Sequence, residues 1–488
     1  MKPVLTPQAM GRADQHTVAA GTPVSVLMER AGRAVAWEVR RATRGCYGRR
    51  ALVVCGTGNN GGDGVVAART LERWGMRAVV GELAAGLDRR ALLRVLDRSD
   101  IVVDAMYGTG CRGGLVGDAA WLVDVLGGWS GPVVSVDIPS GVDGLTGAVE
   151  GAAVRAHRTV TFAALKPGLI LEPGRSHAGV VTVADIGIEL GADGTGPLPL
   201  GVFEASDVRA AVTPREPTAH KWKSGVMVVG GSDGMTGAPM FVSHAAMRAG
   251  AGIVWCCLPG DDAARRAAGT EVITRALPAT AGGALAPLAA DVVLADISRF
   301  RALAVGPGLG RDPAIREAVS ALVAGARVPL VLDADGLNAL AGDLEPLRAR
   351  QSLGAVTVLT PHDGEYARLA GEPVGADRMA AAVRLAERSG AVVLLKGPGT
   401  VVADPAGRIA LNPTGSAALA TAGSGDVLTG VIAGFLARGL DAFTAAASAA
   451  WVHGRAADRA VESTGPTGLI ASDVLASLAS TLRSLVEQ

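Results

Sequence analysis

The sequence of 488 residues predicts an α/β fold with two domains, each built on a parallel sheet with helices on both faces. Three observations lead to this prediction. Short, wholly apolar runs alternate with helical patterns, and most of these runs end in a glycine-rich segment. A Gly- and Pro-rich stretch, Gly191–Gly201, interrupts the alternation like a linker and predicts a boundary between domains 1–202 and 203–488.

In the first half, three apolar runs are predicted strands, and a polar, glycine-containing segment follows each of them. The runs are Ala51–Cys55, Ile101–Ala105 and Val133–Val136. The segments that follow are Gly56–Gly64, Met106–Gly110 and Asp137–Gly141, and a helix is predicted over Val65–Trp74. This order is typical of a Rossmann-like, doubly wound sheet, in which ligands bind beyond the carboxyl ends of the strands.

In the second half, five further apolar runs are predicted strands, and a glycine-containing or polar segment again follows each of them. The predicted strands are Val226–Val229, Leu303–Val305, Leu330–Leu332, Val356–Leu359 and Val392–Leu395. The segments after them are Gly230–Gly234, Gly306–Gly310, Asp333–Gly336, Thr360–Glu365 and Lys396–Thr400. Because the carboxyl ends of parallel strands meet at one edge of a sheet, we expect these five segments to converge on one site.

Positive and negative side chains balance, with 46 Lys and Arg against 46 Asp and Glu. This balance gives no indication of nucleic acid or of an anionic membrane as a partner. The five cysteines show no metal-ligand spacing, which is typical of a reducing compartment. No signal-peptide pattern begins the chain and no apolar run approaches the roughly 20 residues of a membrane span, so we expect a cytoplasmic protein.

Lysine is rare among the basic residues, and four of the five lysines lie beside glycine-rich or proline-containing loops. They are Lys2, Lys166, Lys221, Lys223 and Lys396. A compact ammonium is not equivalent to a guanidinium where space is limited. Lys166 and Lys396 are therefore candidates for contacts with an anionic ligand, with a surface position as the alternative.

The segment Gly56–Gly61 fits the pattern G-x-G-x-x-G, and Glu82 lies about 20 residues further on, as in a dinucleotide-binding motif. Asp63 argues against that interpretation, because its carboxylate would repel a pyrophosphate. The neighbouring loops also supply hard oxygen ligands suited to a group I or II cation. These come from Asn59, Asn60, Asp104, Asp137 and Ser140. The alternative is that these side chains only cap helices and fill turns.

The stretch Thr421–Gly430 places Gly423 and Gly425 directly before Asp426 and an apolar helical pattern. Backbone N–H groups at such a helix start can bind an anion. Asp426 is then either a helix cap or a base that faces a phosphate. No Walker-type motif is present, but Lys396–Thr400 offers an ammonium, two glycines and a hydroxyl at a strand end. Phosphoryl transfer requires such charge neutralisation together with a base.

The segments Gly56–Gly64, Asp104–Gly110 and Asp137–Gly141 resemble the N-terminal YjeF-type domain, the NAD(P)H-hydrate epimerase family. That family interconverts the R and S hydrates of NADH and NADPH, called NADHX and NADPHX. The resemblance implies a K⁺ ion held by Asn60, Asp104 and Ser140. It implies substrate contacts by Asn59, Asn60, Gly61, Gly62, Asp63, Gly108, Thr109, Gly110, Cys111, Arg112, Gly113, Gly114 and Asp137. We predict that Asp137 accepts and donates the proton.

The second half resembles the C-terminal YjeF-type domain, a ribokinase-like fold with ADP-dependent (S)-NAD(P)H-hydrate dehydratase activity. The segments that carry the resemblance are His220–Gly225, Gly230–Ser232 with Gly237–Ala238, Arg248–Gly252, Gly306–Gly310, Thr360–Glu365, Lys396–Thr400, Asn412–Gly415 and Ala422–Gly430. The resemblance implies hydrate contacts by Ala238, Gly308, His362 and Asp426, and nucleotide contacts by Lys396, Gly397, Pro398, Gly399, Thr400 and Gly425. It also implies a Mg²⁺ ion beside the transferred phosphate, and Asp426 as the base.

Together the two resemblances predict a bifunctional enzyme that epimerises NADHX and NADPHX and dehydrates the S form with ADP, giving AMP and phosphate. We expect a homo-oligomer, although no residue pattern indicates one. Three alternatives stay open at this point. They are a ribokinase-like vitamin kinase with a regulatory first half, a nicotinamide-dependent oxidoreductase that uses Gly56–Gly61, and a first half that only binds a ligand.

Overall fold

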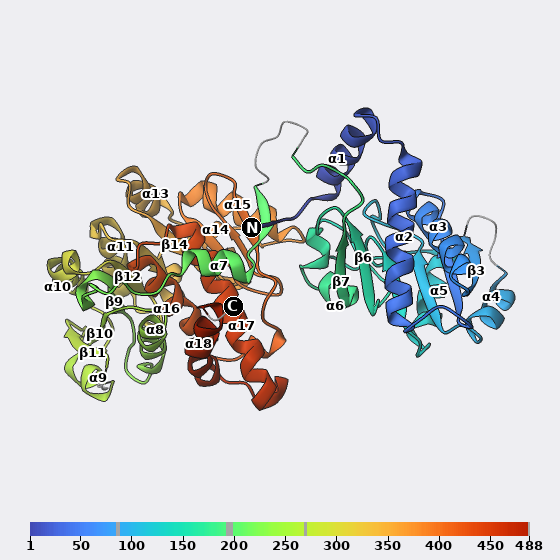
Figure 1. The fold of residues 1–488 in the computed structure, drawn as a ribbon. Helices are drawn as coiled ribbons and strands as arrows, with labels where there is room; N and C mark the ends of the chain where they lie inside the picture. The colour runs from blue at the N-terminus through green and yellow to red at the C-terminus, as the bar shows by residue number, and fades with distance from the viewer. Residues whose placement is uncertain (84–87, 192–198, 268–270, 487–488) are drawn as a thin grey trace. The chain divides into compact units, whose positions relative to one another are not determined.

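The computed structural model describes residues 1–83, 88–191, 199–267 and 271–486, and it divides into two compact units. One unit is Pro3–Gly201, and the other comprises Val202–Gln488 together with Met1–Lys2. Most of the predicted linker Gly191–Gly201 lies outside the described residues. The assignment of an activity to each half stays a prediction here. Figure 1 shows the order of helices and strands in each unit.

The first unit contains a six-stranded sheet in the order β3-β2-β4-β5-β6-β7, and all of its strand pairs are parallel. The strands are β2 (Arg50–Cys55), β3 (Arg77–Glu82), β4 (Ile101–Ala105), β5 (Val133–Val136), β6 (Arg158–Phe162) and β7 (Val180–Ala184). The helices are α1 (Pro7–Ala19), α2 (Val24–Ala42), α3 (Asn59–Arg73), α4 (Arg89–Leu96), α5 (Gly117–Gly127) and α6 (Gly174–Ala178).

The strands β2, β4 and β5 are buried on both faces, which explains why they read as continuous apolar runs. Val53 of β2 packs in one core cluster with residues of α2 and α3, such as Val35 and Leu71. Its neighbour Leu52 points to the opposite face and packs with Leu92 of α4 and Leu122 of α5. Alternate residues of one strand thus contact helices on opposite faces, as a doubly wound sheet requires.

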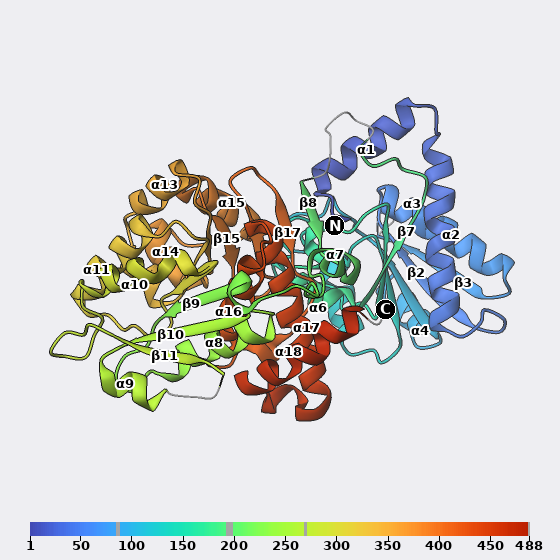
Figure 2. The same ribbon diagram turned by 60° about the vertical axis from the view of Figure 1, so that its left-hand side comes forward.

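The second unit is built on an eleven-stranded sheet in the order β1-β8-β17-β16-β15-β14-β13-β12-β9-β10-β11. The strands are β1 (Lys2–Pro3), β8 (Leu200–Val202), β9 (Gly225–Val229), β10 (Ile253–Pro259), β11 (Ile273–Leu277), β12 (Ala302–Val305), β13 (Leu330–Leu332), β14 (Thr357–Leu359), β15 (Val392–Leu395), β16 (Val401–Ala403) and β17 (Ile409–Leu411). From β15 to β11 every pair is parallel, whereas β15, β16 and β17 pair in antiparallel fashion. Figure 2 shows β9, β10 and β11 side by side.

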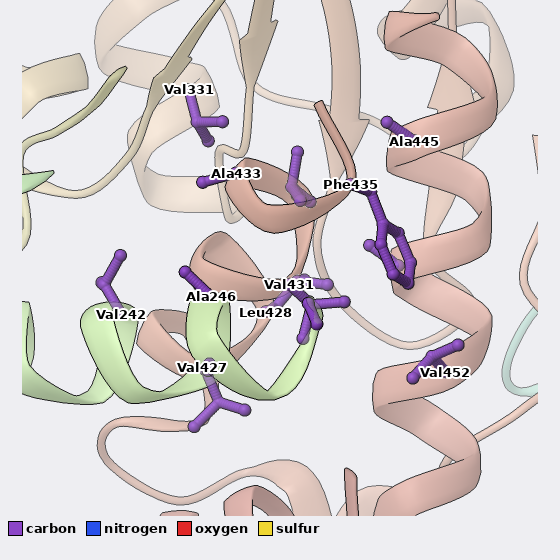
Figure 3. Close-up of a cluster of buried hydrophobic side chains, with 14 of the residues drawn as sticks. Val242, Ala246, Val331, Val427, Leu428, Val431, Ala433, Phe435, Ala445 and Val452 are labelled. Carbon is purple, nitrogen blue, oxygen red and sulfur yellow. The ribbon is translucent and has the colours of Figure 1, made fainter. Parts of the chain in front are cut away.

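Helices flank this sheet. They are α7 (Ala205–Ala211), α8 (Gly237–Arg248), α9 (Asp261–Arg266), α10 (Ala289–Asp296), α11 (Pro313–Gly325), α12 (Asp335–Ala339), α13 (Glu345–Ser352), α14 (Asp363–Ala370), α15 (Arg378–Ser389), α16 (Ser424–Ala437), α17 (Ala442–Gly468) and α18 (Ala471–Val486). Helix α16 lies in the core between α8 and α17, with Val427, Val431 and Phe435 all buried. Figure 3 shows Phe435 against α17 and Val242 and Ala246 on α8.

The α/β fold class is confirmed, and all eight predicted strands are present within one residue of their predicted bounds. One boundary was wrong: the helix predicted from Val65 begins at Asn59, so most of the predicted loop Gly56–Gly64 is helical. Its first turn, Asn59–Gly62, carries no apolar periodicity and two glycines, both of which argue against a helix. Burial of Gly61 and Gly64 in the packed unit overrides that local preference. The antiparallel edge formed by β16 and β17 was not predicted.

Candidate functional site

A cavity of about 500 Å³ lies in the first unit, beside the residues that follow β2, β4 and β5. Eight residues of the predicted substrate set line it: Asn59, Asn60, Asp63, Gly108, Thr109, Gly110, Cys111 and Asp137. The other five are not among its lining residues: Gly61, Gly62, Arg112, Gly113 and Gly114. Lys166 and Asp14 line the same cavity, and Asp14 had no signal in the sequence. Three carboxyl groups and one ammonium therefore share this cavity.

Asp137 follows β5 directly and is fixed by three donors. Its Oδ1 accepts hydrogen bonds from Lys166 Nζ at 2.8 Å and from Thr161 Oγ1 at 3.1 Å. Its Oδ2 accepts one from the backbone N–H of Thr109 at 3.2 Å. The backbone of Asp137 has a φ of +66°, which side-chain-bearing residues rarely adopt and which is found most often at functional sites. The side chain is thus oriented at the cavity wall at some local conformational cost.

Lys166 is only 1% exposed, so it is not a surface lysine. Besides Asp137, its ammonium donates to Thr161 Oγ1 at 2.8 Å and to the carbonyl oxygen of Phe162 at 2.9 Å. These three acceptors use all three donors of the ammonium. Lys166 therefore holds the orientation of Asp137, and the protein itself already occupies every hydrogen that it could offer to an anionic ligand.

The two other carboxyl groups of the cavity bind their protons more tightly than ordinary aspartates. Burial raises the pKa of Asp63 to about 8, with a further contribution from the charges of Asp137 and Asp14. Burial also raises the pKa of Asp14 to about 6, although Lys166 acts in the opposite direction. The negative charge that the sequence argument assigned to Asp63 is therefore largely absent at neutral pH.

Two of the three residues predicted to hold a cation, Asp104 and Ser140, are hydrogen-bonded to each other. Asp104 is buried and accepts hydrogen bonds from Ser140 Oγ at 2.6 Å, Ser135 Oγ at 2.8 Å and the backbone N–H of Ser140 at 2.9 Å. Burial raises the pKa of Asp104, and the hydrogen bonds from Ser140 oppose that rise. Among the described residues, no Lys, Arg or His nitrogen lies within 4 Å of its carboxylate.

Asn60, the third residue of this predicted set, lies near Asp137. A Cβ built on Gly108 would lie 3.0 Å from Asn60 Oδ1 and 3.2 Å from Asp137 Oδ2, so these two atoms face one small space. The Nδ2 of Asn60 is buried without a hydrogen-bond partner among the described residues. An unpaired buried amide is costly, so a group that the chain does not supply has a place here.

In the second unit, the five predicted strand-end segments do lie at one edge, because β9, β12, β13, β14 and β15 are adjacent and parallel. The segments contact one another. A Cβ on Gly308 would lie 3.4 Å from the Cβ of Ala238, the first helical turn after β9. Gly231 donates a hydrogen bond to the carbonyl oxygen of Pro307 at 2.8 Å. The sheet order thus brings together loops from distant parts of the sequence.

Lys396 follows β15 and connects three of these segments. Its Nζ donates to Asp333 Oδ1 at 2.7 Å and lies 3.6 Å from Glu365 Oε2. Asp333 Oδ2 also accepts a hydrogen bond from Thr429 Oγ1 of α16 at 2.6 Å. Burial alone would lower the pKa of Lys396, but the charges of Asp333 and Glu365 outweigh it and raise the pKa. The structure thus makes Asp333 the hydrogen-bonding partner of Lys396.

Asp426 is the third residue of α16 and is half-buried. Burial raises its pKa to about 7, Asp333 and Glu365 raise it as well, and Lys396 opposes them. Among the described residues, no hydrogen bond or ion pair reaches its carboxyl group. A plain helix cap would accept a hydrogen bond from the backbone of its own first turn. Asp426 is therefore a carboxyl group near its titration midpoint at neutral pH and free to accept a proton.

The two residues Gly423 and Gly425, which precede Asp426, are glycines for different structural reasons. Gly423 has a φ of +86°, a conformation that favours glycine. Gly425 has an ordinary helical backbone, and a Cβ there would meet only Lys396 Nζ, at 3.5 Å, an ordinary contact. The protein itself therefore does not require glycine at residue 425. Its bare backbone leaves space beside the ammonium of Lys396, at a helix N-terminus that favours an anion.

His362 is the N-cap residue of α14. Its Nδ1 accepts hydrogen bonds from the backbone N–H of Gly364 at 3.0 Å and of Glu365 at 3.4 Å, which caps α14. The backbone N–H of His362 in turn donates to Glu365 Oε2 at 2.9 Å, completing a capping box. The ring is nevertheless exposed, with Nε2 lying 3.5 Å from Glu365 Oε1. Capping of α14 therefore explains the position of only one ring nitrogen of His362, Nδ1.

Arg378, which sequence reasoning missed, stabilises the loop that begins at Lys396. Arg378 Nη2 donates to the carbonyl oxygen of Lys396 at 2.7 Å, and Arg378 Nη1 lies 2.8 Å from Asp363 Oδ1. A Cβ on Gly397, whose φ is +142°, would lie 2.6 Å from Arg378 Nη2. Arg378 therefore ties the strand-end loop after β15 to the first residue of α14. With 41 of the 46 basic residues being arginine, nothing in the sequence distinguishes it.

Comparison with protein families matches both halves of the chain. Residues 226–479 match the NAD(P)H-hydrate dehydratase family, and residues 24–88 and 84–168 match the family of YjeF-related protein N-termini. The bifunctional NAD(P)H-hydrate repair enzyme of Moorella thermoacetica is 40% identical, over 96% of this chain and 94% of its own length. The enzyme of the same description from Escherichia coli is 34% identical, over 94% of this chain and 89% of its own.

Among solved structures, the ADP/ATP-dependent NAD(P)H-hydrate dehydratase of Bacillus subtilis, co-crystallised with ATP and Mg²⁺, is similar to the second half. It is 29% identical, covers 58% of this chain and 98% of its own, and has a TM-score of 0.50. No helix in the described part of the chain is long and apolar enough to cross a membrane.

Proposed function

The chain belongs to the family of bifunctional NAD(P)H-hydrate repair enzymes, and on that premise we propose that it repairs hydrated nicotinamide cofactors at two separate sites. The first unit epimerises R- and S-NADHX and NADPHX. The second unit dehydrates the S form at the expense of ADP, which yields NADH or NADPH, AMP and phosphate. Because spontaneous hydration gives both epimers and the dehydratase uses one, an epimerase in the same chain makes all of the damaged cofactor repairable.

Dehydration requires a better leaving group than hydroxide. The hydroxyl oxygen of the hydrate attacks the terminal phosphorus of ADP while Asp426 takes the hydroxyl proton, and AMP leaves. The lone pair of the ring nitrogen then expels phosphate, and a proton leaves the neighbouring ring carbon to restore the dihydropyridine. The single observation that carries this proposal is that Asp426, which has no protein partner among the described residues, stands beside Lys396 and the open space at Gly425.

The nucleotide is proposed to bind along Lys396–Thr400 and Gly425. Its phosphates meet the ammonium of Lys396 and the first N–H groups of α16. The described residues contain no group of three or more His, Cys, Asp or Glu that could hold a metal ion alone. The residues therefore fit a Mg²⁺ ion held chiefly by the nucleotide phosphates and water, as Mg²⁺ commonly is. Such an ion would neutralise charge on the transferred phosphate.

Epimerisation is assigned to the cavity of the first unit. The carbon that carries the hydroxyl of the hydrate also carries the ring nitrogen, so the hydroxyl can leave and return to the opposite face. This exchange requires a group that gives and takes a proton, and Asp137, oriented by Lys166 and Thr161, is proposed for it. Asn60 and the backbone around Gly108 and Thr109 are proposed to contact the substrate.

A K⁺ ion is proposed beside this cavity, held by Asn60, Asp104 and Ser140. The support is the buried carboxylate of Asp104, which has no cationic side chain within 4 Å among the described residues, and the oxygen-rich set around it. Hydroxyl, amide and carboxylate oxygens suit a hard cation. The ion would supply positive charge close to a substrate with two or more phosphate charges.

A homo-oligomer and a cytoplasmic location also stay predictions.

One experiment tests the proposed function. The protein is incubated with mixed NADHX epimers and ADP, and the return of the nicotinamide absorbance is followed. Complete recovery supports both activities. Recovery that stops at the S fraction leaves the dehydratase alone, and no recovery with either ADP or ATP contradicts the proposal.

A further inference from the structure

A second cavity, of about 260 Å³, lies in the second unit among α11, α12 and α14. Three arginines line it: Arg311, Arg316 and Arg368. They belong to the loop before α11, the first turn of α11 and the last turn of α14, respectively. None of the predicted contact residues for the hydrate or the nucleotide lines this cavity, and we call it the arginine pocket.

The charges of the arginine pocket are not neutralised within the described part of the protein. None of the three guanidinium groups lies within 4 Å of a carboxylate oxygen there. Two acids line the pocket, but both are engaged by other donors. Asp335 accepts from Gly310 N at 2.8 Å and from Asn338 Nδ2 at 3.2 Å, and Asp312 caps α11 by accepting from Ala314 N at 2.9 Å. The three arginines and two aspartates that line the pocket give it a net charge of +1. This charge and the N-terminus of α11 both favour binding of an anion.

Arg368 is the best oriented of the three. Its Nε donates to Asn338 Oδ1 at 2.7 Å, which fixes the plane of the guanidinium and leaves the two terminal nitrogens for a ligand. This fork matches the geometry of phosphate oxygens. Asn338 is itself held by Asp335, so a chain of hydrogen bonds from the Gly310 loop to α14 sets the orientation of Arg368.

The arginine pocket adjoins the predicted hydrate site. A Cβ on Gly364 would lie 3.0 Å from Cε1 of His362 and 3.6 Å from Nη1 of Arg368, so the histidine ring and the guanidinium approach the same backbone position. On the other side, Gly310 is bonded to Asp335 and lies two residues after Gly308, the predicted hydrate contact. The pocket and the hydrate site therefore share two loops at the same edge of the sheet.

We propose that the arginine pocket binds a phosphate group of the dinucleotide substrate during dehydration. This inference rests on the proposed function, because it concerns the same substrate at the same site. The reacting ring is only one end of NADHX, and its phosphates must lie elsewhere along the molecule. The cation at the reaction centre, Lys396, donates to Asp333 and is assigned above to the phosphates of ADP, so the phosphates of the dinucleotide require another cation. The pocket volume of about 260 Å³ is below the roughly 300–1,000 Å³ of a site for a whole small molecule, which suits one part of a dinucleotide.

Two phosphate sources share this chemistry, and kinetics separate them. Arg368→Gln and the double variant Arg311→Gln/Arg316→Gln are assayed with S-NADHX and with S-NADPHX, each at saturating ADP. A KM that rises at least about tenfold (about 1.4 kcal/mol) for both substrates identifies the pyrophosphate. The same rise for S-NADPHX alone identifies the 2′-phosphate. In either case kcat and the KM for ADP stay near the wild-type values.

The proposal is overturned if neither KM rises, if the KM for ADP rises instead, or if kcat falls at unchanged KM. Arg348→Gln is the matched control, because Arg348 is an exposed arginine on α13 that does not line the pocket. Binding of NADH and NADPH is measured in parallel by cofactor fluorescence, with the first unit contributing the same background to every variant. If the wild type does not dehydrate the hydrates, the proposed function is wrong. Unchanged binding of NADH and NADPH in the arginine variants would separately contradict the proposal that the arginine pocket binds a phosphate group.

Discussion

Lys166 and Lys396 are both lysines that donate to an aspartate at the carboxyl edge of a sheet, at 2.8 Å and 2.7 Å. In the first unit the lysine binds Asp137, the residue assigned to proton transfer. In the second unit it binds Asp333, and the assigned base Asp426 has no such partner among the described residues. In the proposed function, the same pair of residue types thus orients the carboxylate assigned to proton transfer in one site and leaves the assigned base available beside the proposed nucleotide in the other.

The difference agrees with what each site is proposed to bind. In the mechanism proposed for the second unit, the base is not bonded to the ammonium that meets the phosphates, and Asp333 and Glu365 hold Lys396 in place instead. In the epimerisation proposed for the first unit no phosphate is transferred, and Lys166 can orient the assigned carboxylate instead. Four predictions test this comparison.

The largest effect is expected from Asp426→Asn. An amide cannot accept the hydroxyl proton, so kcat for dehydration of S-NADHX should fall by about 10²–10⁴-fold, the usual contribution of a general base. The absorbance of the restored nicotinamide measures this. Epimerisation, followed by chromatography of the R and S forms, should be unchanged and is the internal control. Normal dehydration would contradict the assignment of Asp426.

Asp137→Asn should produce the reciprocal result. Epimerisation should slow by about 10²–10³-fold, and dehydration of pure S-NADHX should continue at the wild-type rate. With mixed epimers and ADP, recovery of NADH should stop at the S fraction. A variant that still equilibrates the epimers at the normal rate would remove Asp137 from proton transfer.

Lys166→Met tests orientation rather than proton transfer. Removing one partner of a buried pair leaves an uncompensated carboxylate, and the free energy of unfolding of the first unit should fall by about 3 kcal/mol. Urea denaturation measures this, with Lys223→Met as the exposed control. In the folded variant, kcat for epimerisation should fall while the KM for the hydrate changes little. A rise in KM alone would indicate instead that Lys166 binds the substrate.

The smallest effect is a shift in pH dependence. Asp426 must be deprotonated to act as a base, and its pKa is raised to about 7. Dehydratase kcat/KM should therefore fall as the pH drops below about 7, tenfold for each further pH unit. Glu365 helps to raise this pKa, so Glu365→Gln should move the acidic limb to lower pH. Glu387→Gln, an exposed residue on α15, is the control. An unmoved limb in Glu365→Gln would show that another group titrates.

Much of this comparison was open to prediction from sequence. The strand ends were visible because parallel strands that are buried on both faces read as apolar runs, and the helix start at Asp426 because two glycines precede a periodic pattern. The partners of the two lysines were not visible. Thr161 and Lys166 approach Asp137 only because β6 pairs with β5, and Thr429 reaches Asp333 only because α16 lies against the sheet.

The early start of α3 has the same kind of cause. Asn59–Gly62 has poor helix propensity, and only packing within the unit makes it helical. Asp14 and Arg368 lie on helices whose own residues give no sign of a cavity nearby. Side chains that depend on contacts between distant elements therefore required the structure, whereas those adjacent to a strand end did not.

The burial of α16 sets limits on how the second site can work. Eleven consecutive residues of this helix, Val427–Ala437, are buried. A helix surrounded on all sides cannot tilt without opening the core, so α16 holds Asp426 in a fixed position. Any closure around the substrates must therefore come from movement of the loops after β9, β12, β14 and β15. Repacking around Val431 or Phe435 should accordingly slow turnover through misalignment, although neither side chain comes near the chemistry.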